Sequence, residues 1–212
     1  MIRKVFEDRH EAGDLLAAAL APHIQRPATV LAVPRGGVVV GAAVAHALGA
    51  PLDVVIPRKL GAPGNPELAI GAVAPGVRVL HDRTIRQLGV SEGYLEAEAA
   101  RQEEEIRRRE GAYRGGRAPA PVAGRTAIVV DDGVATGATA VAALRWARGA
   151  GAERVVFAAP VGPRAARARL QPECDDVILL LEPPGFLAVG EWYRDFDQVS
   201  DAEVIRLLRD AG

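Results

Sequence analysis

The sequence is poor in the residues that build disulfides and metal sites. Its 212 residues include one cysteine, Cys174, which excludes an intrachain disulfide framework and a cysteine-based zinc site. The four histidines are scattered and match no metal-ligand spacing. No run approaches the roughly 18 apolar residues of a membrane span, and the first residues lack the apolar stretch of a signal peptide. We therefore expect a cytoplasmic protein without a membrane partner.

An excess of either charge is also missing, because 26 basic residues face 27 acidic ones. Proteins that bind nucleic acid through its phosphates are usually more basic, so we expect no nucleic-acid partner. The composition, 49% hydrophobic and 25% charged, is that of an ordinary globular protein. The length suits one α/β domain with an added lobe better than two full domains.

Short apolar runs alternate with helical segments along most of the chain. Residues 29–33 and 53–56 are predicted strands, and residues 38–48 between them a helix, which makes a βαβ unit with parallel strands. The alternation resumes later with three further strands and two helices, predicted at 126–130, 137–148, 154–160, 164–170 and 177–181. This pattern predicts a doubly wound, mainly parallel sheet with ligands at the carboxyl ends of its strands.

The middle of the chain, residues 58–123, interrupts this alternation and predicts an inserted lobe. Residues 58–66 are rich in proline and glycine and predict a mobile loop. Residues 68–73 and 77–80 predict a hairpin, since Pro-Gly separates them. Residues 91–110 predict a charged helix, which either faces solvent or carries a partner or a lid.

One segment combines groups that suit a phosphorylated sugar. A strand ending at Val130 leads to Asp131 and Asp132, which can accept hydrogen bonds from a vicinal diol such as that of ribose. The backbone amides that follow open a helix and can cradle a phosphate, to which Thr136 and Thr139 can add hydroxyl donors. The residues expected around the phosphate are Val134, Ala135, Thr136, Gly137, Ala138 and Thr139.

Rival interpretations of the two acids explain less. A Walker B pair would require G-x-x-x-x-G-K-[ST] elsewhere, and a dinucleotide site would require G-x-G-x-x-G after a strand; the sequence has neither. If Asp131 and Asp132 only capped the sheet and tethered a turn, two acids and two threonines within nine residues would have no evident purpose.

Residues 131–139, Asp-Asp-Gly-Val-Ala-Thr-Gly-Ala-Thr, resemble the motif with which type I phosphoribosyltransferases bind phosphoribosyl pyrophosphate (PRPP). The order of segments is similar too. Pro34-Arg35-Gly36-Gly37 stands where the family has its pyrophosphate loop, the loop from Arg58 stands at its mobile catalytic loop, and residues 183–212 stand at its hood. The resemblance implies one phosphoribosyltransferase-like domain over residues 1–212. It also implies transfer of a pentosyl group from PRPP to a nitrogenous base, with release of pyrophosphate.

The resemblance also assigns roles near the sugar and the pyrophosphate. It implies that Asp131 and Asp132 hold the ribose hydroxyls and that residues 135–139 hold the 5′-phosphate. Arg35, Gly36 and Gly37 would face the pyrophosphate, and the Pro34–Arg35 peptide is a candidate for the cis form. Arg58 and Lys59 would close over the pyrophosphate. Mg²⁺ is expected with PRPP, its protein ligands are left unassigned, and a homodimer is a family expectation.

The base site is less defined. Members that act on hypoxanthine or guanine carry an acid where this chain has Ala135, so a 6-oxopurine is disfavoured. Gly133 is a second departure, since a bulkier apolar residue is usual there. Phe186 and Tyr193 are candidates to stack on the base, whereas the other hood rings, Phe196 and Trp192, are expected to pack.

Two other functions remain open at this point. The same motif serves a PRPP-sensing regulator without catalysis, whose charge balance would favour a protein partner. A different nucleotide-binding α/β protein, such as an oxidoreductase, is the third hypothesis. An active enzyme with PRPP and a nucleobase as its small-molecule substrates is the leading one.

Overall fold

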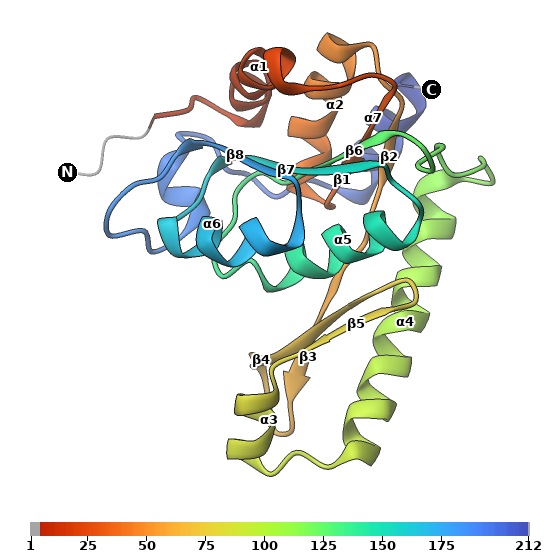
Figure 1. Ribbon diagram of the computed structural model, residues 1–212, viewed down its shortest axis with the longest axis vertical. Coiled ribbons are helices and arrows are strands. Elements are labelled where there is room, and N and C mark those ends of the chain that lie inside the picture. Colours follow the sequence, from red (N-terminus) through yellow and green to blue (C-terminus); the bar gives the residue numbers. More distant parts are fainter. Residues whose placement is uncertain (1–4, 212) are drawn as a thin grey trace.

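A parallel sheet of five strands forms the centre of the molecule (Figure 1), in the order β2-β1-β6-β7-β8. The structure is a computed structural model that describes residues 5–211. Every neighbouring pair in this sheet runs parallel. The strands are β1 (Ala28–Ala32), β2 (Leu52–Val54), β6 (Thr126–Val130), β7 (Arg154–Val161) and β8 (Asp176–Leu181).

Helices cover both faces of this sheet, which confirms the predicted doubly wound α/β fold (Figure 1). On one face lie α1 (Arg9–Leu20) and α2 (Gly36–Leu48), with α7 (Asp201–Asp210) packed against α2. On the other face lie α5 (Ala138–Gly149) and α6 (Arg164–Leu170). None of the helices within residues 5–211 combines the length and the apolar character that a bilayer crossing requires.

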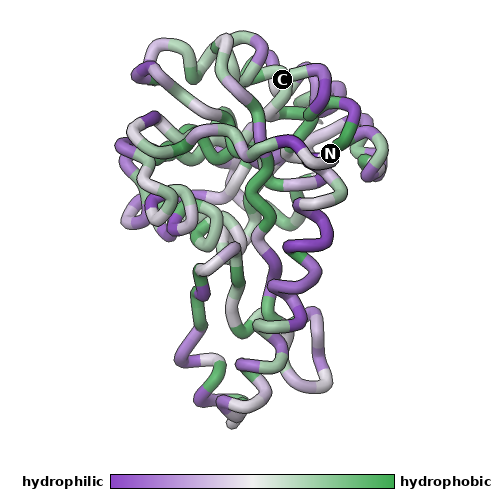
Figure 2. Tube along the Cα trace, turned by 90° about the vertical axis from the view of Figure 1, so that its right-hand side faces the viewer, coloured by the Kyte–Doolittle hydropathy of each residue, from purple (hydrophilic) through white to green (hydrophobic). Residues whose placement is uncertain are grey.

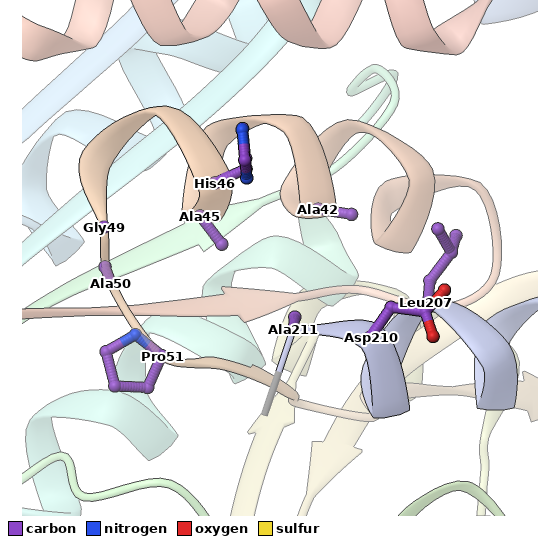
Figure 3. A pocket seen from close by; sticks show the side chains of 9 residues that line it. All are labelled: Ala42, Ala45, His46, Gly49, Ala50, Pro51, Leu207, Asp210 and Ala211. Atoms are coloured by element: carbon purple, nitrogen blue, oxygen red, sulfur yellow. The ribbon is translucent and has the colours of Figure 1, made fainter.

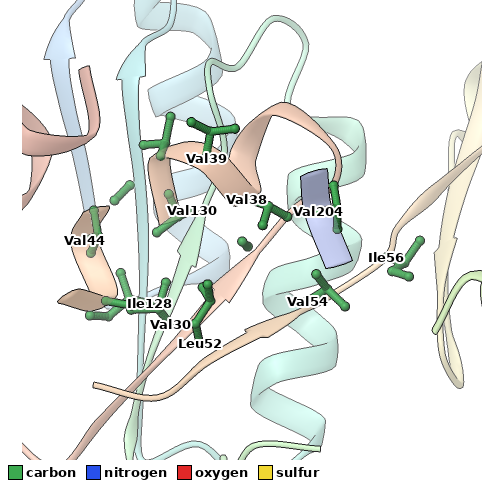
Figure 4. Close-up of a cluster of buried hydrophobic side chains, with 14 of the residues drawn as sticks. Val30, Val38, Val39, Val44, Leu52, Val54, Ile56, Ile128, Val130 and Val204 are labelled. Carbon is green, nitrogen blue, oxygen red and sulfur yellow. The ribbon is translucent and has the colours of Figure 1, made fainter. Parts of the chain in front are cut away.

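The central strands β1 and β6 are buried along their whole length, since helices cover both of their faces. Alternate side chains enter opposite cores: Val30 and Ile128 point to the α2 side (Figure 4), whereas Leu31 and Val129 join the α5 side. Full burial of each such side chain contributes about 1.5–3 kcal/mol. This alternation between the two cores therefore fixes the register of β1 and β6, the strands that lead to residues 34–37 and 131–139.

A lobe projects from the sheet after β2 (Figures 1 and 2). It contains a three-stranded antiparallel sheet and two helices: β3 (Arg58–Ala62), β4 (Asn65–Ala74), β5 (Val77–Leu80), α3 (Asp82–Leu88) and α4 (Glu92–Arg114). The predicted hairpin and charged helix are confirmed, and α4 continues to Arg114.

The prediction of a loop at residues 58–66 is wrong, since most of these residues lie in strands. Arg58–Ala62 is strand β3, which pairs with β4, and Leu60 is fully buried. The glycines that suggested a loop serve the hairpin instead. A Cβ at Gly61 would lie 2.7 Å from Cα of Pro66, and Gly64 turns the chain with φ of 72°.

Helix α4 is charged, yet it does not face solvent all round. Ser91 caps it by accepting a hydrogen bond from the backbone N–H of Tyr94 (3.3 Å). Ala99, Ile106 and Tyr113 form a buried stripe along it. The helix thus packs against β3 and β4 within the lobe and against α7 of the core, so it connects the lobe with the core.

Candidate functional site

The fold brings residues 34–37 and residues 131–139 together at one edge of the sheet. Strands β1 and β6 are parallel neighbours, with Ala32 paired to Val130, so the segments that follow them meet. A Cβ at Gly36 would lie 1.8 Å from Oδ2 of Asp132, and one at Gly37 would lie 2.9 Å from Cα of Asp131. Glycine is therefore required at both positions, because the backbone of the loop touches the acid pair.

The loop at the start of α2 has the backbone geometry expected from the sequence. The Pro34–Arg35 peptide is cis, as predicted. Gly36 is the first residue of α2, so its N–H group belongs to a helix N-terminus beside the acids. Arg35 directs its Nη1 towards Oδ1 of Asp201, 3.7 Å away.

The two acids are half-buried and lie in different surroundings. Oδ1 of Asp131 accepts a hydrogen bond from the backbone N–H of Asp132 (2.9 Å). Burial raises the pKa of Asp131 well above its ordinary value, and the neighbouring charge of Asp132 adds to the rise. Burial also raises the pKa of Asp132, but its hydrogen bond with Arg9 opposes that rise. The ionised form is therefore disfavoured more strongly at Asp131, because the hydrogen bond from Arg9 supports the ionised form of Asp132.

Arg9 is a site residue that sequence reasoning missed. Its Nε donates to Oδ2 of Asp132 (2.7 Å), and the two side chains are only 11% and 15% exposed. Its Nη1 donates to the backbone oxygen of Asp197 (2.8 Å), and the guanidinium lies 3.8 Å from the centre of the Phe196 ring. A lone arginine 123 positions before its partner carries no signal in a single sequence; only the packing of α1 on the sheet reveals it.

The turn from β6 into α5 has the expected form, with one correction. Gly137 precedes α5 with φ of 75°, a conformation that favours glycine. The first N–H groups of α5, at Ala138 and Thr139, have no acceptor within the helix and can serve a phosphate. The N–H of Val134, however, donates to the backbone oxygen of Val161 (2.9 Å), so Val134 is wrong as a member of the phosphate cradle. Ala135 and Thr136 are exposed beside it.

Arg58 and Lys59 lie on β3, and their side chains contact other residues of the lobe. Nε of Arg58 donates to Oε1 of Gln102 on α4 (2.9 Å), and Nζ of Lys59 lies 3.2 Å from Oε2 of Glu67. Neighbours on a strand point to opposite faces, so the two side chains diverge. Their closing over a pyrophosphate stays a prediction.

Among the hood rings, Tyr193 differs from its prediction. It is fully buried between Phe6 and Phe196, with ring centres 5.3 and 5.0 Å away. Its hydroxyl donates to the backbone oxygen of Asp132 (2.6 Å), and burial raises its pKa. Tyr193 thus supports the acid pair and presents no face to a base, which corrects that prediction. Phe186 is partly buried against the same cluster, and its stacking on a base stays a prediction.

Packing was expected for Phe196 and Trp192, and both join the small hydrophobic cluster around Tyr193, which confirms it. The structure also explains the unusual Gly133. A Cβ there would lie 2.4 Å from Cγ1 of Val189, in the short helix η3 (Val189–Trp192) of the hood. Val189 therefore fills the space that a bulkier residue 133 would need.

Two other features lie away from the acid pair. A cavity of about 570 Å³ lies between the second half of α2 and the end of α7 (Figure 3), at the far end of α2 from Arg35. Cys174 is half-buried, its Sγ donates to the backbone oxygens of Leu170 and Asp176, and burial raises the pKa of its thiol to about 11. A thiol whose pKa is raised in this way is a poor nucleophile at neutral pH.

Comparisons with known proteins agree with this geometry. The phosphoribosyl transferase domain family matches residues 6–188. A curated Mycobacterium tuberculosis protein, provisionally named a phosphoribosyl transferase, is 47% identical over 206 residues, which cover 97% of this chain and 46% of that protein. The chain thus spans about half the length of the curated relatives it matches.

Solved structures show the same fold. A protein of Thermus thermophilus is 47% identical, with a TM-score of 0.83 and coverage of 98% of this chain and 99% of that one. A purine phosphoribosyltransferase of Pyrococcus horikoshii is 15% identical, with a TM-score of 0.50 and coverage of 91% and 92%. The second likeness concerns the fold alone.

Proposed function

Because this chain belongs to the phosphoribosyl transferase domain family, we propose that it binds PRPP and transfers the phosphoribosyl group to a nitrogenous base. The observation that carries the proposal is the contact between the glycine loop and the acid pair, where a Cβ at Gly36 would lie 1.8 Å from Asp132. The residues proposed to accept the diol, cradle the phosphate and bind the pyrophosphate follow β1 and β6, whose carboxyl ends meet at one edge of the sheet.

The reaction exchanges one bond to the sugar carbon C1 for another. The C1–O bond to pyrophosphate breaks and its electron pair leaves with the pyrophosphate. A C1–N bond to the base forms, and the base gives up a proton. Donors placed at the departing oxygens stabilise this step, since charge develops there in the transition state. In this chain the N–H groups at the start of α2 and the Arg35 guanidinium are suited to that task.

The acid pair would hold the sugar while the bond breaks. Asp132, held by its hydrogen bond with Arg9, can accept from one ribose hydroxyl, and Asp131 can accept from the neighbouring hydroxyl. The N–H groups of residues 135–139 and the hydroxyls of Thr136 and Thr139 would anchor the 5′-phosphate. Fixing the sugar at both ends aligns C1 with the incoming base.

Magnesium would arrive with PRPP. Within residues 5–211 the structure holds no cluster of three metal-binding side chains, so the oxygens of PRPP would supply most of the ligands. When bound, the metal would add positive charge beside the pyrophosphate. The acceptor base stays open. Ala135 is exposed and carries no acid for a purine ring proton, which disfavours a 6-oxopurine.

The first test compares Asp132→Asn with wild type. Loss of a charge-assisted hydrogen bond should weaken the affinity for PRPP with magnesium about tenfold or more, measured by titration calorimetry. Asp14→Asn, an exposed position on α1, removes the same charge and should bind like wild type. Equal binding by Asp132→Asn would contradict the proposal.

Turnover is measured separately, as pyrophosphate release with a panel of nucleobases. Release that depends on a base and disappears in Asp132→Asn supports transfer. Tight PRPP binding without release from any base would instead favour the non-catalytic PRPP sensor.

A further inference from the structure

Arg169, near the end of α6, contacts the loop that is proposed to cradle the 5′-phosphate. It is partly buried, and its Nη1 donates to the backbone oxygen of Thr136 (3.4 Å). A Cβ at Gly137 would lie 3.7 Å from Cδ of Arg169, so the aliphatic part of the side chain lies against the same loop. Arg169 thus links residues 136 and 137 to α6.

This loop has few other hydrogen bonds that fix its backbone. Bonds to β7 and within α5 hold its two ends, at Val134 and Gly137. Among the contacts of residues 5–211, the bond from Arg169 is the one hydrogen bond to the backbone of Ala135 or Thr136. A phosphate requires several N–H groups directed at one point, so a contact that fixes this backbone in advance favours binding.

His81, a residue of the inserted lobe, holds the guanidinium group of Arg169. Nη2 of Arg169 lies 2.7 Å from Nε2 of His81. Arginine can only donate, so Nε2 is the acceptor and the ring proton is on Nδ1. That nitrogen then donates to the backbone oxygen of Ala69 on β4 (3.3 Å), and the backbone N–H of His81 donates to the oxygen of Ile70 (2.9 Å). The imidazole is therefore fixed to the hairpin of the lobe and presents one acceptor to Arg169.

The chain of contacts joins three parts of the molecule that are distant in sequence. His81 stands between β5 and α3, Arg169 belongs to α6, and Thr136 precedes α5. Helix α5 lies between the central sheet and the hairpin of β4 and β5, and it packs against both of these strands (Figure 1). The inserted lobe therefore supports the start of α5, where the phosphate loop ends.

We propose that Arg169 is a positioning residue for the 5′-phosphate of the substrate. It holds residues 135–139 in the form that binds phosphate, and His81 holds Arg169 in place, so that the inserted lobe takes part in binding the sugar phosphate. This inference rests on the proposed function, but it concerns one end of the substrate, which can be measured alone as ribose 5-phosphate.

The test uses Arg169→Met and His81→Leu, with Arg164→Met as the matched control, since Arg164 is an exposed residue of the same helix. Titration calorimetry measures the affinities for ribose 5-phosphate and for inorganic pyrophosphate with magnesium. Arg169→Met should weaken the affinity for ribose 5-phosphate about tenfold, and His81→Leu about threefold. The control should change neither affinity. Because His81→Leu leaves the charge of Arg169 in place, its effect reports positioning and not charge.

Two further comparisons separate positioning from general damage to the fold. The affinity for pyrophosphate should stay at the wild-type value in every variant, because the loop proposed to bind it, residues 34–37, follows a different strand. His81→Gln keeps an oxygen that can accept from Arg169, so it should bind ribose 5-phosphate more tightly than His81→Leu does. The double variant should bind like Arg169→Met alone, since His81 acts through Arg169.

Wild-type affinity for ribose 5-phosphate in Arg169→Met would overturn the inference, and so would an equal loss of affinity for both ligands. Wild-type affinity in His81→Leu would overturn the part assigned to the lobe. If wild type binds ribose 5-phosphate through Arg169 but does not bind PRPP, this inference stands and the proposed function fails. If PRPP binds and Arg169→Met has no effect, the proposed function stands and this inference fails.

Discussion

At the scale of single residues, the acid pair shows a conflict between binding and stability. Asp131 and Asp132 are adjacent, half-buried and close to a glycine loop that admits no side chain. Arg9 relieves the conflict mainly at Asp132, through one short hydrogen bond. Asp131 keeps only a backbone donor, so its ionised form is disfavoured until a ligand occupies the site.

This conflict predicts that Asp131→Asn stabilises the free protein at high pH. A carboxyl whose pKa is raised by folding contributes its full stability only below the ordinary range, about pH 4, and loses it as the pH rises through the raised value. Asparagine keeps the acceptor oxygen and escapes this loss. The variant should melt higher than wild type at pH 8, by about 2–4 °C for each kcal/mol gained.

Calorimetric scans of both proteins at several pH values check this. The difference in Tm should vanish in acid and grow with pH, while PRPP binding weakens. A difference that is constant with pH, or a variant that melts lower than wild type at pH 8, would show that the acid is not strained by burial.

At the scale of elements, local pattern was a good guide where a segment carries its own signal. The strand at residues 126–130 and the helix at 138–149 were predicted to within a residue, because a continuous apolar run and a small-residue turn describe a buried strand and the helix after it. Strand β3 was missed because a segment with glycine resembles a loop in composition. In the structure, Gly61 instead permits the close pairing of β3 with β4. Tyr193 was misjudged since aromatic content does not reveal which rings are enclosed.

An element-scale prediction concerns how α4 is anchored on the core. Nε of Arg114, at the end of α4, lies 3.0 Å from Oδ1 of Asp53 on β2, and the side chains are 13% and 8% exposed. Arg114→Met leaves the Asp53 charge buried without its cation, which should cost about 3–5 kcal/mol. Arg107→Met, an exposed position on the same helix, should change the free energy of unfolding by less than about 0.5 kcal/mol. Urea titrations measure both, and equal midpoints would contradict the prediction.

At the scale of the whole molecule, parts of the chain that are distant in sequence contact one another beside the acid pair. The backbone N–H groups of Val5 and Phe6 donate to the oxygen of Trp192, and that of Arg194 donates back to Phe6. The N-terminal segment is thereby paired with the hood, and the hood rests on Gly133 through Val189. The position of the hood therefore depends on contacts between residues far apart in the sequence, which no local sequence pattern predicts.

This closure predicts a paired effect at Gly133 and Val189. Gly133→Val should lower stability by about 1–3 kcal/mol, because the new side chain collides with Val189. Adding Val189→Ala should recover part of that loss, as a double-mutant cycle measured by thermal unfolding would show. Gly111→Val, where a Cβ meets nothing within 4 Å, is the control. Strictly additive effects would contradict the contact.

The low reactivity expected of the Cys174 thiol has a practical consequence. Since burial keeps it protonated at neutral pH, maleimide dyes should react far faster with a cysteine placed at an exposed position. Leu88 on the lobe and Leu15 on α1 are both 48% exposed. Cysteines introduced there could carry a fluorescent pair without removal of the native residue, and energy transfer would then report in real time whether the lobe swings towards the sheet as pyrophosphate enters.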